Sequence, residues 1–151
     1  MICIVRVRGI IGIRSDVNDA MRMMHLTRVN HCVIERMTPE LKGTLQKVKD
    51  YVTWGEISTE TLAALIERRG RLTGGRPITP EYLKTQGFDG FVSLAEALER
   101  GDVVWRKMDD VKPLFRLSPP RKGYRSTKRS FTEGGSLGKR ESIDDLIMRM
   151  V

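Results

Sequence analysis

The sequence predicts an α+β fold: a small layered core of three strands and two helices, a helical extension, and a long basic loop. Three observations lead to this prediction. Short β-branched runs alternate with amphipathic helical periods in the first sixty residues. Helix-start signals dominate the middle of the chain, and one tract near its end holds most of the net positive charge. With 151 residues, the chain has the length of one domain with an appendage.

The first predicted element is a strand at residues 2–7, where the side chains are mainly aliphatic and β-branched. Arg6 and Arg8 have the opposite parity from Val5 and Val7, so we expect both guanidinium groups on one strand face. A strand face that carries two arginines is either solvated or in contact with RNA.

The rest of the core is predicted to alternate helices and strands, with both helices on one face of the sheet. A glycine-flanked loop at 9–14 precedes the first helix, and Ser15 or Asp16 can cap that helix. The next core elements are a strand at 31–37 and a helix that starts with Pro39. Residues 51–57 either continue that helix or form a third strand, and we favour the strand.

The extension, residues 58–112, is predicted to be helical. Its first helix covers 59–69 and is followed by a basic, glycine-rich loop at 71–77. Two shorter helices are expected at 79–85 and 93–100, the second opened by a capping box of Ser93 and Glu96. We therefore divide the chain into a core (1–57), this helical extension (58–112), and a C-terminal segment (113–151) whose strand and terminal helix pack back on the core.

The C-terminal segment carries the strongest functional signal. From Arg121 to Arg140 it has seven basic residues against one acidic residue, Glu133, which is +6 of the chain's net +8. The charges are interleaved with glycines, serines, Tyr124 and Phe131, and no apolar periodicity runs through them. Such a segment can follow a polyanion, because each cation placed at a phosphate releases condensed counterions. We predict an extended cationic arm on nucleic acid, with Tyr124 stacking on a base.

Both basic segments also have an interpretation without a binding function. A charge run is usually a solvated loop, but the apolar residues on either side of this one predict that both of its ends are anchored. The loop at 71–77 either cradles phosphates through backbone N–H groups of Gly74 and Gly75 or simply closes two helices. It is not a Walker loop, because no Gly-Lys-Ser or Gly-Lys-Thr follows.

No catalytic, cofactor or metal site is predicted. Cys3 and Cys32 form no CxxC pair and are expected to be small buried hydrophobes of a reducing compartment. The spacing of His25, His31 and Cys32 fits no recognised zinc pattern, and no nucleophile and base occur together in a motif. No apolar run approaches the roughly 18 residues of a membrane span. We expect a soluble, intracellular protein with no small-molecule substrate.

Several segments, taken together and in order, resemble the large-subunit ribosomal protein L-thirty family in its long archaeal form, which is related to the eukaryotic ribosomal protein L-seven. The resemblance implies a ferredoxin-like core, no catalysis, and a structural role on ribosomal RNA of the large subunit beside neighbouring ribosomal proteins, in cytoplasmic ribosomes. The matching segments are IVRVRGIIG (4–12), RVNHC (28–32), MTPELKG (37–43), DYVTWG (50–55), LIERRG (65–70), FRLSPPRKG (115–123), EGGSLG (133–138) and the final IDDLIMRM.

On this interpretation, the candidate RNA contacts form two groups. The core group is Arg6, Arg8, Arg14, Arg28, Lys42 and Lys47, and the second group is Arg71, Arg76, Arg116, Arg121, Lys122, Tyr124, Arg125, Lys128, Arg129, Lys139 and Arg140. Two alternatives stay open at this stage. One is a free-standing RNA-binding ribosome-assembly factor, and the other is a small enzyme or ligand-binding regulator that uses the Gly74–Gly75 loop for a phosphate.

Overall fold

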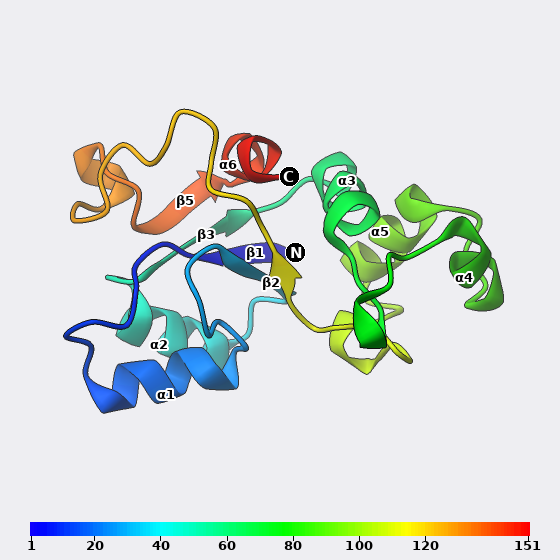
Figure 1. The fold of residues 1–151 in the computed structure, drawn as a ribbon, viewed down its shortest axis with the longest axis horizontal. Coiled ribbons are helices and arrows are strands. Elements are labelled where there is room, and N and C mark those ends of the chain that lie inside the picture. The colour runs from blue at the N-terminus through cyan, green and yellow to red at the C-terminus, as the bar shows by residue number, and fades with distance from the viewer.

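The computed structural model describes residues 1–151 and confirms the α+β class (Figure 1). Five strands form one sheet in the order β4-β2-β1-β3-β5. The strands are β1 (Ile2–Arg6), β2 (His31–Glu35), β3 (Val52–Glu56), β4 (Phe115–Arg116) and β5 (Gly138–Ser142). The helices are α1 (Ser15–Met23), α2 (Pro39–Val48), α3 (Thr59–Arg69), α4 (Pro80–Thr85), α5 (Phe91–Arg100) and α6 (Asp144–Met150).

Strand β1 lies at the centre of the sheet and sets its register. It pairs antiparallel with β2 and β3, so that Ile4 has Val33 on one side and Trp54 on the other. Strand β5 extends the sheet parallel to β3, and the short β4 pairs antiparallel with β2. Because side chains alternate along a strand, this arrangement sends β1 side chains into two separate cores.

Helices cover both faces of the sheet. On one face, α1 and α2 bury a cluster of 12 residues that includes Met21 and Leu45, as expected for the core helices (Figure 1). On the other face, the extension and the terminal helix bury a larger cluster of 23 residues that includes Leu65, Leu98 and Ile147. The extension is therefore joined to the sheet by a continuous apolar core. No helix of the protein has the length and apolar composition needed to cross a bilayer.

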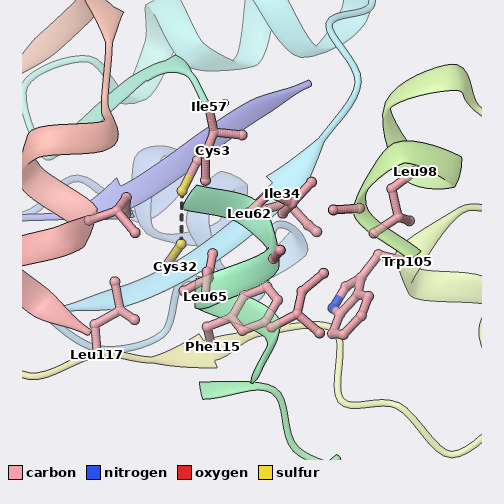
Figure 2. Close-up of a cluster of buried hydrophobic side chains, with 14 of the residues drawn as sticks. Cys3, Cys32, Ile34, Ile57, Leu62, Leu65, Leu98, Trp105, Phe115 and Leu117 are labelled. Carbon is pink, nitrogen blue, oxygen red and sulfur yellow. Dashed lines mark hydrogen bonds between the residues drawn. The ribbon is translucent and has the colours of Figure 1, made fainter. Parts of the chain in front are cut away.

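Figure 2 shows the larger cluster, where the sheet meets the extension. The rings of Trp105 and Phe115 are stacked, with centroids 5.1 Å apart and planes at 20°. Phe115 belongs to β4, so this contact attaches an edge strand to the extension. The free thiols of Cys3 and Cys32 face each other in the same cluster, with their Sγ atoms 3.0 Å apart. Burial, and then the contact with Cys32, raises the pKa of the Cys3 thiol well above its usual value.

Two predicted helix starts were wrong. Helix α5 begins at Phe91 after Gly90, so Ser93 lies inside the helix and does not cap it. Phe91 packs against the larger cluster, and this apolar contact favours the earlier start. Helix α1 likewise begins without a side-chain cap from Ser15 or Asp16.

The contact between β4 and the extension gives a stability prediction. Phe115 is completely buried, so Phe115→Ala is expected to lower the free energy of unfolding by about 3–5 kcal/mol, through reduced apolar burial and an unfilled cavity. Urea denaturation measures the change. The control is Ile11→Ala, at a residue 97% exposed, which should stay within about 0.5 kcal/mol of wild type. Equal effects of the two substitutions would contradict the assignment of Phe115 to the core.

Candidate nucleic-acid interface

The basic arm, defined here as residues 118–137, is a folded loop rather than the extended segment that was predicted. Its first part follows the end of α6: the Ser118 N–H donates to the Met150 carbonyl (3.1 Å), and the Arg121 N–H donates to the Arg149 carbonyl (3.0 Å). Its second part closes on itself, since the Ser136 N–H donates to the Ser126 carbonyl at 2.9 Å. The arm runs from β4 to β5, the two opposite edges of the sheet (Figure 1).

The closure of the arm depends on a glycine. A Cβ on Gly135 would lie 2.0 Å from the carbonyl oxygen of Arg129, a distance that no side chain tolerates. The same turn has the Gly135 N–H donating to the Ser130 carbonyl at 2.7 Å. The chain therefore approaches itself closely here, and only glycine allows the approach.

The cations of the arm are exposed and have no acidic partner. All five of them, Arg121, Lys122, Arg125, Lys128 and Arg129, are exposed. The four ion pairs of the protein lie elsewhere, so no carboxylate comes within 4.0 Å of these five side chains. Five uncompensated positive charges on one short loop repel each other, and a polyanion relieves that repulsion.

Arg140 was predicted to be an RNA contact in a basic loop, but it has a structural role in the sheet. It lies on β5 and not in a loop, because residues 138–142 pair with β3. Its Nε donates to Thr53 Oγ1 (2.8 Å), its Nη2 donates to the Ser136 carbonyl (3.1 Å), and its guanidinium lies 4.5 Å from the centroid of the Phe131 ring. Burial, and then the nearby charge of Arg149, lowers the Arg140 pKa. Arg140 thus ties the arm to the sheet, whereas its neighbour Lys139 is exposed.

Tyr124 also faces inward. Its hydroxyl donates to Asn30 Oδ1 at 2.8 Å, and its half-buried ring packs against the larger core cluster. Burial raises the pKa of Tyr124 to about 12. The ring therefore anchors the arm and does not stand out as a surface for base stacking. Phe131, the other aromatic residue of the tract, is 42% exposed.

Arg6 is not on an exposed face, contrary to the prediction. It is completely buried; its Nη1 donates to the Leu26 carbonyl (2.7 Å), its Nε donates to the Arg8 carbonyl (2.8 Å), and Nη2 has no partner. The parity argument failed because β1 is the central strand and is covered on both faces. Arg8 lies just beyond the strand, half-buried, with its guanidinium 5.0 Å from the centroid of the Tyr51 ring.

The other predicted core contacts differ in how far they are neutralised. Arg14 and Lys47 both approach Asp16 Oδ2, at 3.3 Å and 3.6 Å. Arg28 and Lys42 are exposed and form no ion pair.

Burial lowers the pKa of His31, and the charges of Arg116, Arg28 and Arg6 add to this effect. Arg116, which pairs with His31 across the β2–β4 ladder, thus places positive charge at this edge of the sheet.

A second basic feature lies at that edge. A concavity of about 210 Å³, the basic hollow, has six lining residues: Arg69, Arg71, Gly75, Lys112, Leu114 and Arg116. Sequence reasoning identified Arg71 and Arg116 but missed Arg69 and Lys112, and it placed Arg76, an exposed residue outside the hollow, with them. Lys112 was hidden because the bridge of Leu72 with Val111, which brings residue 112 beside residue 71, is long-range.

The chain is similar to known proteins over its whole length. Residues 2–52 match the family described as Ribosomal protein L30p/L7e. The chain is 46% identical to the "Large ribosomal subunit protein uL30" of Methanosphaera stadtmanae over 153 aligned positions, which cover 100% of both chains. The proteins of the same name from Nanoarchaeum equitans and Methanocorpusculum labreanum are 44% and 43% identical, over 98% and 99% of this chain and 97% and 99% of theirs. The similarity thus includes the extension and the arm.

The inward position of Tyr124 gives a pH-dependence prediction. The pKa of an unfolded tyrosine is near 10, whereas burial raises the pKa of Tyr124 in the fold to about 12. Between these values only the unfolded chain loses the proton, so this residue's contribution to stability is complete below about pH 10 and is lost as pH rises toward 12. Tyr124→Phe should remove that part of the alkaline loss. Urea midpoints measured across this range check it, and parallel curves for both proteins would contradict it.

Proposed function

The chain belongs to the ribosomal protein L30p/L7e family, and on that basis we propose that it is a structural constituent of the large ribosomal subunit that binds ribosomal RNA. The family is a class of structural ribosomal proteins and not of enzymes. Its relatives here are archaeal, so the expected setting is the cytoplasmic ribosome of an archaeal type of cell, with ribosomal RNA and neighbouring large-subunit proteins as partners.

The observation that carries the RNA-binding part of the proposal is the set of unpaired cations on the basic arm. These side chains are exposed, close in sequence, and without acidic partners. Phosphate neutralisation by Lys and Arg supplies most of the sequence-independent affinity for nucleic acid, through counterion release. Charge of this kind suits folded RNA, which proteins recognise mainly by shape, phosphate and 2′-hydroxyl contacts.

The folded state of the arm supports the proposal further. Arg140 connects Thr53 of β3 to Ser136 of the arm, and Tyr124 ties the arm to Asn30. A loop that is already closed loses less conformational entropy on binding than a disordered tail does. Exposed Arg28, Lys42 and Lys139 extend the proposed contact beyond the arm. In this arrangement Arg6, Tyr124 and Arg140 hold the structure, while the exposed cations contact phosphates.

Neutralising the arm tests this division of roles. The variant Arg121→Gln, Lys122→Gln, Arg125→Gln, Lys128→Gln, Arg129→Gln should bind large-subunit ribosomal RNA more weakly. Its slope of log affinity against log salt should fall by roughly 0.7–0.9 for each phosphate that the variant no longer neutralises. Filter binding over a range of salt concentrations measures both quantities.

A control of equal charge change shows whether the position of the charge matters. The arm variant Arg125→Gln with Lys128→Gln is compared with Lys84→Gln and Lys107→Gln, two exposed lysines of the extension that form no ion pair. The arm variant should weaken RNA binding more than the control does. An unchanged affinity and slope in the arm variant would overturn the proposed role of the arm.

Co-sedimentation tests membership of the subunit directly. Tagged protein is run with ribosomal particles on sucrose gradients at low and high salt. The expected result is stoichiometric protein in the large subunit that persists at moderate salt. Protein found only in precursor fractions would favour an assembly factor, and absence from every particle would contradict both roles.

A further inference from the structure

The basic hollow is a concentration of positive charge separate from the arm. Four of its six lining residues are cationic, namely Arg69, Arg71, Lys112 and Arg116, and none is acidic. No carboxylate lies within 4.0 Å of any of the four. Like charges around one concavity repel each other at short range, so the arrangement is unfavourable until an anion enters it.

The positive charge of the hollow comes from where its cations are placed and not from the net charge of the extension. Residues 58–112 contain nine basic and nine acidic residues and therefore carry no net charge. Three of those nine cations nevertheless line the hollow, while Asp109 and Asp110, the carboxylates nearest to Lys112 in sequence, do not. A neutral extension that gathers cations at one point differs from a surface with diffusely distributed charge.

Hydrogen bonds fix the walls of the hollow. The Lys112 N–H donates to the Arg71 carbonyl (2.9 Å), which sets the two residues side by side. Arg69 Nη2 donates to Ser118 Oγ (2.6 Å), and Arg71 Nη1 donates to the Gly70 carbonyl (2.7 Å). Because these arginines are held before any ligand arrives, binding would require little reorganisation. The side chains of Lys112 and Arg116 make no hydrogen bond within the protein and remain free to reach a ligand.

We propose that the basic hollow binds one backbone phosphate of the RNA, an inference that rests on the proposed function. Arginine forks match the oxygens of a phosphate, and lysine adds a point charge. The volume of about 210 Å³ is below the roughly 300–1,000 Å³ of ordinary small-molecule pockets, and it suits a phosphate group better than a nucleoside. At Gly75, no atom lies within 4 Å of where a Cβ would be, so the rim is open to an approaching RNA backbone.

The test uses the full chain and purified large-subunit ribosomal RNA. The first variant is Lys112→Gln with Arg116→Gln, chosen because neither side chain supports the fold through a hydrogen bond. The second adds Arg71→Gln. The matched control is Lys84→Gln with Lys107→Gln, which removes the same charge from exposed positions outside the hollow. Thermal melting of each free protein verifies that it is folded, and affinity is measured over a range of salt concentrations.

One shared phosphate predicts a particular pattern. The Lys112/Arg116 variant should lose affinity on the order of tenfold, and its salt slope should fall by about one. Adding Arg71→Gln should change the slope little further, because the first variant already fails to hold that phosphate. The control should retain the wild-type slope.

Other outcomes overturn the proposal in distinguishable ways. If the hollow variants match the control while wild type binds RNA, the hollow is not a contact and the proposed function stands. A slope that falls by a further full step with Arg71→Gln would indicate a diffuse field instead of one site. A third outcome is that inorganic phosphate shifts the NMR signals of the hollow residues while the hollow variants bind RNA as wild type does. In that case the hollow binds a free anion and not the RNA. If wild type itself binds no RNA, the proposed function fails first.

Discussion

The burial of strand β1 on both faces is the constraint on which the rest of the structure depends. Its side chains enter both apolar clusters, so the helices that follow must cover both faces of the sheet. Burial of the whole strand also takes Arg6 inside, where backbone carbonyls of Leu26 and Arg8 accept its hydrogen bonds. A buried guanidinium group without hydrogen-bond partners would be strongly destabilising. The backbone at Leu26 must therefore stay next to the end of β1, where its carbonyl accepts from Arg6.

The same sheet determines where the functional charges lie. Strand β4 at one edge and strand β5 at the other are joined by the basic arm, so both of its ends are attached to the core. Arg140 and Tyr124 point inward and hold the loop, and the exposed cations between them point to solvent. A basic tract therefore contains two kinds of residue with different roles, and its total charge does not distinguish them.

The sequence was sufficient for the fold class, the order of the core elements and the presence of a charged arm, because these follow from local periodicity and composition. It was not sufficient for burial in the third dimension. Parity placed Arg6 outside, since a pattern cannot show that a strand is central. Residues 138–142 resembled a loop, since a parallel edge strand depends on a distant partner, β3. Lys112 was missed because the long-range bridge of Leu72 with Val111 places it beside Arg71.

The cations of the arm and of the hollow have no carboxylate partners, so they are better suited to binding an anion than to stabilising the fold. The fold has few ion pairs, and the exposed ones, such as those of Arg14 and Lys47 with Asp16, contribute little to stability. The arm and the hollow have cations without such partners, although 19 acidic residues are present in the chain. The unpaired cations of the arm and of the hollow repel one another, and a phosphate-rich partner supplies anions that offset this repulsion at both places.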